Sequence, residues 1–369
     1  LVVNHALPPV SEWAFHLDLW QFPFQLSGLC ADNGQKVTPF SSEYFTLVKP
    51  FYQLLADAGQ KVITAYIKDG AFNKGQTMVK WHEAADGKWS FDYTGFDKFV
   101  AQMMSWGIGR QISCFSLVGW NTSIGYTDAS GEARTLKLTV GSDEYRTVWN
   151  EFLDSFERHL KTKGWFEKTV LYMDEIREDE MRQVVSFIKQ HNPDWKIGLA
   201  GSAVSSDVES AFYDYSTILG YDRTSTNAVA TFYTSCAQSI PNAYVSLDNN
   251  PAEMVWVAWY AKAKGLNGFL RWAYDYWTKA DPQDVRDGSN TAGDFSLIYR
   301  SDNSLSSVPL SSIRLELLRE GIQDYEKMRI LSTNLMNPVV QKFTLTSGRF
   351  AGEIVTEAQG MLKKISAEY

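Results

Sequence analysis

Eight short apolar segments recur along the chain, and segments of helical periodicity separate most of them. This alternation constrains the fold more than any other feature, because alternating strands and helices form parallel sheets covered by helices. The chain length fits one barrel, so we predict a (β/α)8 barrel of the TIM type with a short helical C-terminal tail. The strands are expected at 13–20, 61–67, 111–118, 170–175, 196–200, 215–220, 228–233 and 267–273, and helices at 42–58, 92–106, 143–163, 178–191, 251–264 and 311–331.

The predicted organisation is a barrel over residues 1–332 and a helical tail over 333–369, packed on the barrel. Among the segments that connect expected strands, 201–214 has the weakest helical pattern. The stretches 119–142 and 278–308 are expected to be long loops at the active face. A doubly wound open sheet is the alternative. No GxGxxG follows any expected strand, so a dinucleotide role lacks its phosphate-binding feature.

Composition excludes several classes of function. The net charge is −8 with no Lys/Arg-rich run, which argues against a nucleic-acid partner, and no apolar stretch is long enough to span a bilayer. Cys30, Cys114 and Cys236 show no CxxC spacing, and the five His residues form no HExxH pattern. We therefore predict neither a metal nor a cofactor.

The sequence begins at Leu1 without a signal peptide, yet we expect a secreted, periplasmic or cell-surface location. The oligomeric state stays open.

The stretch TVLYMDEIR at 169–177 carries the principal candidate site. A short apolar strand runs directly into Asp174 and Glu175, at the end of a strand where ligands bind in parallel α/β proteins. Adjacent acids repel each other, so one pKa should be raised and the other kept low. Such a pair suits a site that needs a proton donor and an anion at one pH. For the acids at 178–180 we favour the simpler interpretation, a helix N-terminus.

Aromatic residues are unusually frequent, with 13 Trp, 18 Tyr and 21 Phe. Several follow expected strands, among them Trp120, Trp272, Tyr274 and Trp277. A ring with a polar edge suits the flat face of a sugar as well as it suits a hydrophobic core.

Motifs spread over most of the chain resemble glycoside hydrolase family 123 and the related domain-of-unknown-function 4091 proteins. They are WAFHLDLWQFP at 13–23, LYMDE at 171–175, FYTSC at 232–236, GFLRWAYDYW at 268–277, AGDFSLIYR at 292–300 and SSIRLELLREGIQDYEKM at 311–328. The resemblance implies a glycan substrate and a retaining β-N-acetylgalactosaminidase that works by substrate assistance, a recognised exception to the two-carboxylate rule. Glu175 would be the general acid/base. Asp174 would position and polarise the 2-acetamido group, which attacks the anomeric carbon.

Two departures from the family pattern leave substrate choice open. Family members often have Pro after the acid pair, where this chain has Ile176, and the amino-terminal β-sandwich often found before the barrel is not in this sequence.

The remaining predicted residues would contact the substrate. Tyr233, at the end of strand seven, would donate to the acetamido oxygen, and at least one aromatic after strand eight would form the sugar platform. Each has an alternative, since Tyr233 and Trp272 could be core aromatics, Asp18 a buried structural acid and Asp294 a turn residue. The predicted substrate contacts are Tyr233, Trp272, Tyr274, Trp277, Asp18, Trp120 and Asp294.

Two other functions compete with this hypothesis. A glycosidase of different sugar specificity with its own carboxylate nucleophile would need an acid at the end of another strand. At strand seven the chain has Tyr233 and Ser235, and Glu253 comes only in the next helix. The other alternative is a non-catalytic glycan-binding barrel. The linkage, the aglycone, galacto versus gluco preference and exo versus endo action stay open.

Overall fold

A parallel sheet of eight strands organises the fold, in the order β1-β14-β13-β12-β11-β10-β7-β4. The computed structural model describes residues 6–69, 76–221, 226–282, 284, 291, 293–331 and 334–368. Leu17 of β1 bridges in parallel to Gln60, two residues before β4, and the sheet is nearly closed as a barrel. The strands are β1 (His16–Leu19), β4 (Val62–Tyr66), β7 (Gln111–Phe115), β10 (Thr169–Asp174), β11 (Lys196–Gly201), β12 (Asp214–Ile218), β13 (Val229–Thr234) and β14 (Gly268–Arg271).

The predicted (β/α)8 barrel is confirmed, and all eight expected strands are present within a few residues of their predicted bounds. The chain divides into two compact units. Unit 1 comprises 1–61, 218–225 and 230–369, and unit 2 comprises 62–217 and 226–229.

The helices of unit 2 begin and end where the sequence signals them. Ser142 caps α4 (Asp143–Lys163) by accepting a hydrogen bond from the Tyr145 amide at 3.1 Å, and Gly164 ends it in a left-handed conformation. Helix α5 (Glu178–His191) has the predicted bounds. Helix α3 (Thr94–Ser105) begins two residues later than predicted, and the only helix within 201–214 is the short α6 (Ser206–Glu209).

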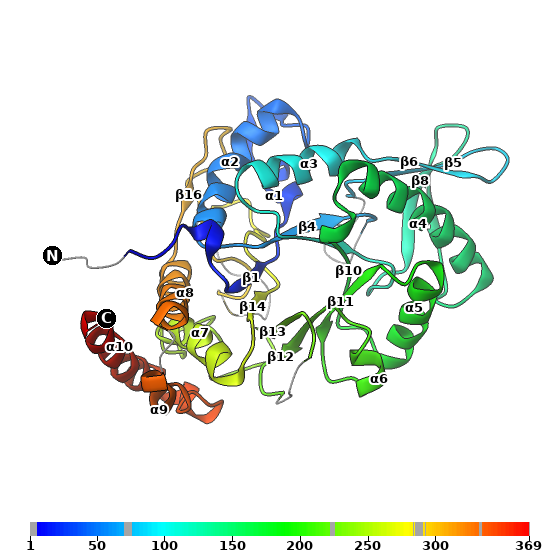
Figure 1. Cartoon of the computed structure of the whole chain (residues 1–369). Coiled ribbons are helices and arrows are strands. Elements are labelled where there is room, and N and C mark those ends of the chain that lie inside the picture. The colour runs from blue at the N-terminus through cyan, green and yellow to red at the C-terminus, as the bar shows by residue number, and fades with distance from the viewer. Residues whose placement is uncertain are drawn as a thin grey trace. The chain divides into compact units, whose positions relative to one another are not determined.

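A separate four-stranded sheet belongs to unit 2, in the order β6-β5-β8-β9 (Figure 1). Its strands are β5 (Lys80–Glu83), β6 (Trp89–Asp92), β8 (Ser123–Thr127) and β9 (Ala133–Lys137). The prediction of one long loop over 119–142 is therefore wrong in part. The β8–β9 hairpin was missed because β8 is mostly half-buried, β9 is mostly exposed and both are largely polar, whereas the expected strands were identified by runs of apolar residues.

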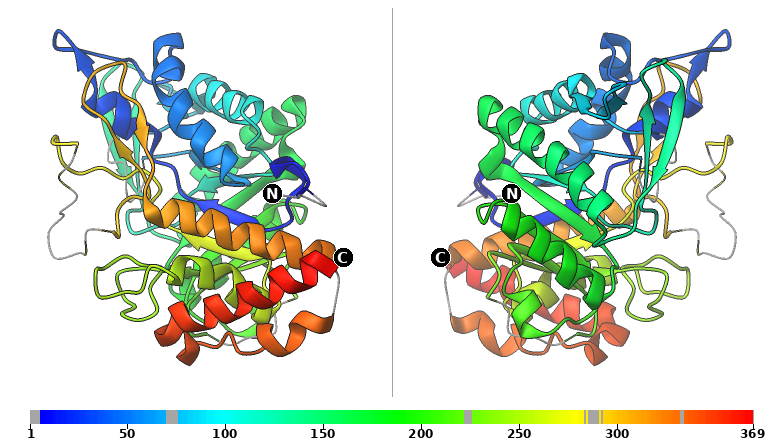
Figure 2. Two further views of the ribbon diagram at one scale, coloured as in Figure 1. Left: turned by 90° about the vertical axis from the view of Figure 1, so that its left-hand side faces the viewer. Right: turned by 90° about the vertical axis from the view of Figure 1, so that its right-hand side faces the viewer.

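The helices of unit 1 include α1 (Pro23–Leu29), α2 (Ser42–Asp57), α7 (Glu253–Lys264), α8 (Ile313–Leu331), α9 (Asn337–Val340) and α10 (Ala351–Glu368). Helix α7 is buried over most of its length, and Gly321 of α8 permits close approach, because a Cβ there would lie 2.7 Å from the Val255 carbonyl oxygen. Helix α10 contacts both α7 and α8, and Figure 2 shows α8 in orange beside α10 in red.

The predicted tail is mostly helical in the described residues, with α9 and α10, while its boundary at 332/333 falls on residues outside the described part. The loop predicted at 278–308 also lies partly outside it; the described portion contains β15 (Tyr299–Arg300). In the described residues no helix has the length and apolar character needed to cross a membrane. Within the same residues, no group of three or more His, Cys, Asp or Glu side chains could hold a metal ion.

Candidate active site

The acid pair stands at the carboxyl end of β10 in unit 2. Asp174 is the last residue of the strand and pairs with Ala200 of β11, and the Glu175 amide still donates to the Ala200 carbonyl at 2.7 Å. Glu175 has a φ of +51°, in the left-handed region that residues other than glycine rarely occupy. The sheet hydrogen bonding thus continues through Glu175 while the backbone turns sharply, and helix α5 begins three residues later.

The two acids differ in their surroundings. Asp174 is half-buried and Glu175 is exposed. Burial raises the pKa of the Asp174 carboxyl well above its ordinary value, and the neighbouring Glu175 carboxylate raises that pKa further. We expected one raised pKa in this pair, and the family resemblance implied that Asp174 polarises the 2-acetamido group. The raised pKa falls on Asp174 itself, so this residue holds its proton more tightly than an ordinary Asp.

A groove of about 510 Å³ opens beside the pair, a volume that suits a small ligand. Glu175 to Arg177 and Glu180 line one part of it, while the segment 119–123 and Lys137 line another. The indole of Trp120 is 65% exposed and its Nε1 donates to the Asp174 carbonyl at 3.2 Å. Trp120 therefore borders a groove that Glu175 also lines, and its contact with substrate stays a prediction.

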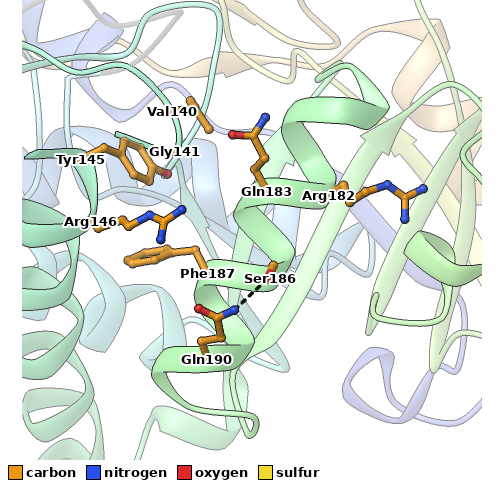
Figure 3. Close-up of a pocket in the computed structure, with 9 residues that line it drawn as sticks. All are labelled: Val140, Gly141, Tyr145, Arg146, Arg182, Gln183, Ser186, Phe187 and Gln190. Atoms are coloured by element: carbon orange, nitrogen blue, oxygen red, sulfur yellow. Dashed lines mark hydrogen bonds between the residues drawn. The ribbon is translucent and has the colours of Figure 1, made fainter. Parts of the chain in front are cut away.

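Another cavity of unit 2, about 250 Å³, lies between α4 and α5 (Figure 3). Tyr145 and Arg146 of α4 and Gln183, Phe187 and Gln190 of α5 are among the residues that line it. It contains no predicted site residue, so the groove beside Glu175 is the better candidate for the active site.

A second cluster of predicted residues follows β14 in unit 1. Buried Arg271 forms an ion pair with buried Asp294 at 2.5 Å and donates to both the carbonyl and the hydroxyl oxygen of Thr234 at 2.9 Å. The half-buried indole of Trp272 donates to the same Asp294 carboxylate at 3.3 Å. Asp294 and Trp272 are thus brought together, and the Asp294 carboxylate is held by two neighbouring side chains.

The other predicted substrate contacts are buried in unit 1. The Tyr274 hydroxyl donates to the Phe51 carbonyl at 2.8 Å, and Trp277 Nε1 donates to the Ile298 carbonyl at 3.0 Å. Tyr233 of β13 and Asp18 of β1 are also buried. Of the three predicted aromatics that follow β14, Trp272 has the most exposed surface, and the substrate contacts of the buried four stay predictions.

A family model of the glycoside hydrolase 123 catalytic domain matches residues 26–331. The chain belongs to glycoside hydrolase family 123. A family 123 glycoside hydrolase from Clostridium perfringens, solved in a study of glycolipid glycan hydrolysis, superposes with a TM-score of 0.88 at 25% identity. The match covers 100% of this chain and 72% of that one. The resemblance seen in the sequence is thereby confirmed, and the chain is a glycoside hydrolase with a barrel fold.

More distant structures also match this family 123 chain. A glucosidase from Croceicoccus marinus is 11% identical with a TM-score of 0.42, and covers 74% of this chain and 62% of its own. The maltogenic α-amylase AmyB from Thermotoga neapolitana is 10% identical with a TM-score of 0.44. That match covers 87% of this chain and 77% of the amylase chain. A search of curated protein sequences found no match.

Two charged residues of this family 123 barrel were not predicted from the sequence. Arg271 stands in the motif GFLRW, and Lys68 follows the apolar strand VITAYI. A single cation directly after a buried strand was the available signal in both places. Nothing in the sequence, however, indicated which oxygen atoms would compensate either charge.

Proposed function

We propose that this glycoside hydrolase removes terminal β-linked N-acetylgalactosamine with retention of configuration, using the substrate's own 2-acetamido group as the nucleophile. The observation that carries the proposal is the adjacent Asp174–Glu175 pair at the end of β10, beside a groove bordered by Trp120. The Clostridium perfringens relative, solved in a study of glycolipid glycan hydrolysis, supports a glycan as the substrate class.

Glu175 supplies the proton transfers in this proposal. In the first step the acetamido oxygen attacks the anomeric carbon, the glycosidic bond breaks, and Glu175 gives its proton to the departing oxygen. The resulting oxazolinium ion carries the positive charge that the broken bond left behind. In the second step Glu175 takes a proton from water, the water oxygen attacks the same carbon, and the acetamido group is released. Two inversions at one carbon give retention. The exposure of Glu175 in the groove suits contact with both the leaving group and water.

Asp174 supplies the anion. The amide nitrogen becomes positively charged in the oxazolinium ion, and a carboxylate beside it stabilises that charge in a partly desolvated place. The raised pKa of Asp174 means that the free enzyme needs a pH above that pKa for the carboxylate to form. A bound amide N–H, and then the cationic intermediate, lower the pKa of Asp174 and so favour the anion when it is needed.

Among the residues that the structure describes, the acids near the end of β13 favour substrate assistance over a carboxylate nucleophile of the enzyme. Strand β13 ends in Tyr233 and Thr234, and Glu253 is buried at the start of α7. The Glu253 carboxylate accepts hydrogen bonds from the Asn242 amide at 2.6 Å and from Asn249 Nδ2 at 3.2 Å. Such an acid is engaged in holding a loop rather than free to attack a sugar.

Aryl glycosides in galacto and gluco form, with 2-acetamido or 2-hydroxy groups, test the proposal. The 2-acetamido galactoside should be hydrolysed with retention and the 2-hydroxy galactoside should be essentially inert. Fluorines on the acetyl methyl should slow turnover steeply, because they weaken the attacking carbonyl oxygen. Brisk hydrolysis of the 2-hydroxy galactoside, or a trapped glycosyl-enzyme ester, would instead establish an enzymic nucleophile. Binding without turnover of any glycoside would favour the non-catalytic barrel.

A further inference from the structure

Lys68 is a buried cation of unit 2 that the proposed chemistry does not use. It follows β4, and its side chain is 1% exposed, which is rare for lysine unless the charge is compensated. Nζ donates to three backbone carbonyls, those of Asp69 at 3.0 Å, Asn121 at 2.8 Å and Ser123 at 3.2 Å. The three donors of the ammonium group therefore meet three acceptors, two of them on a segment more than 50 residues away in sequence.

Asp69 holds the same distant segment through its side chain. Its Oδ1 accepts a hydrogen bond from the Gly125 amide at 3.0 Å. Within the segment, Asn121 Oδ1 accepts from the Ser123 amide at 2.9 Å, which closes a local turn. A Cβ at Gly125 would lie 3.4 Å from the Asp69 carboxylate, so the backbone is in van der Waals contact with this side chain. Two consecutive residues after β4 thus fix residues 121–125.

The segment that they fix is a wall of the candidate active site. Residues 119–123 line the groove that Glu175 also lines, and Trp120 reaches from this segment to the Asp174 carbonyl. Because the indole is mostly exposed, packing alone does little to hold it. Its place beside the acid pair depends on the backbone that carries it.

We propose that Lys68, supported by Asp69, is a positioning residue that fixes segment 119–123 and thereby sets where Trp120 stands beside the Asp174–Glu175 pair. The inference rests on the proposed function only in taking this groove as the place where substrate binds. Lys68 acts on the groove indirectly, because its ammonium group binds backbone carbonyls of the segment that lines the groove. Neutral acceptors at all three positions favour the charged amine, even though burial lowers the pKa of Lys68 to about 8.

Lys189 provides a matched control in the same unit. Its Nζ donates to the carbonyls of Pro193 at 2.8 Å and Trp195 at 2.7 Å, and burial lowers its pKa as well. These carbonyls precede β11, so Lys189 secures a loop at the amino end of a strand, whereas Lys68 follows the carboxyl end of one. Lys68 is buried and Lys189 is half-buried, but replacement of either removes an ammonium group from backbone carbonyls, and only Lys68 should affect the groove.

Hydrogen exchange tests the anchoring without any substrate. In Lys68→Met the hydrogen-bonded amides of Ser123 and Gly125 should exchange about tenfold faster or more, the equivalent of losing one hydrogen bond to a charged group. A strand peptide covering 169–174 should exchange as before, which shows that the barrel is intact. Lys189→Met should leave 119–125 unchanged. Lys68→Gln, whose amide keeps two donors, should lie between Met and the native residue and serves if Lys68→Met does not fold. Unchanged exchange at 119–125 in both Lys68 variants would overturn the proposal.

Kinetics on an aryl 2-acetamido-β-galactoside test the consequence. Lys68→Met should raise KM by about tenfold while kcat falls much less, because the groove wall moves and the acids stay in place. Lys189→Met should leave KM unchanged. In a double-mutant cycle, adding Lys68→Met to Trp120→Ala should cost little more than Trp120→Ala alone. Fully additive effects, or an equal KM rise in Lys189→Met, would contradict positioning through Trp120. A wild-type protein inactive on every glycoside would refute the proposed function, and the exchange experiment would then decide the role of Lys68.

Discussion

The groove beside Glu175 and the Arg271–Asp294 cluster use acids in opposite ways. In the cluster, Asp294 faces a guanidinium and an indole N–H, both side chains of the ion pair are buried, and the donors are fixed by a strand end. In the groove, Asp174 has another acid as its sequence neighbour and its pKa is raised, while Glu175 is exposed on a left-handed backbone. An acid held by a cation contributes to structure. An acid with a raised pKa beside another acid is a candidate for the proton transfer and charge stabilisation that the proposed function assigns to this pair.

The largest expected effect separates Glu175 from the other acids of its segment. Glu175→Gln should lower kcat/KM by about 10³- to 10⁴-fold on glycosides with poor leaving groups, and much less on activated aryl glycosides that need little protonation. The alkaline limb of the pH profile should also flatten. Glu178→Gln is the control, because Glu178 is engaged with Arg182 at 2.8 Å and should affect activity little. Equal losses on both substrate types would place the general acid elsewhere.

The cluster should show its effect in stability. Arg271→Met leaves the buried Asp294 carboxylate without its cation, which should reduce the free energy of unfolding by about 3–5 kcal/mol in denaturant titrations. Adding Asp294→Asn to this variant should recover part of the loss, because the uncompensated charge is removed. If Arg271→Met proved as stable as the native protein, the ion pair would not be the structural element that the comparison requires.

The contribution of Asp174 to the free energy of unfolding should change with pH in the opposite sense to that of an ion-paired acid. Its folded pKa is raised, so its contribution to stability is fully present below the unfolded pKa of Asp and is lost as the pH rises through the folded value. Asp174→Asn should therefore be more stable than the native protein at neutral pH, by an amount that disappears at low pH. The same variant should be much less active, and the acid limb of its kcat/KM profile should flatten. A stability difference independent of pH would argue against the raised pKa.

The smallest expected effect compares two aromatics that follow β14. Trp272→Ala should weaken substrate binding by about 1–3 kcal/mol while the fold survives, because this ring is half-buried. Tyr274→Phe removes only the hydrogen bond to the Phe51 carbonyl, so it should reduce stability by about 1 kcal/mol and leave KM unchanged. Inhibition constants and denaturant midpoints of the two variants check these outcomes. A change in KM for Tyr274→Phe would assign this hydroxyl to the substrate after all.

The sequence predicted the barrel well because its strands are buried and therefore apolar in runs, as at Val62–Tyr66 and Val170–Met173. Helix α5 was placed correctly because its acids and its periodicity agree. The half-buried β8 and the exposed β9 have neither signal, so they were taken for a loop.

The acid pair could be found from its position after a strand, but its electrostatics could not be assigned. Burial decides that Asp174 has the raised pKa, and burial depends on neighbours that the sequence does not place. The same limit applies to Lys68, whose carbonyl partners at Asn121 and Ser123 are remote in sequence. The pairing of Arg271 with Asp294 was missed for the same reason.

The backbone at Glu175 implies a trade-off between activity and durability. A left-handed conformation costs a residue with a Cβ about 1–2 kcal/mol, and glycine escapes that cost. Glu175→Gly should therefore be inactive yet no less stable than the native enzyme, and Glu175→Asn should be tolerated better than Glu175→Val. A selection for thermal stability alone would tend to remove this acid. In the proposed function, this conformational cost is what the fold gives up to keep a carboxylate at the position of the general acid/base.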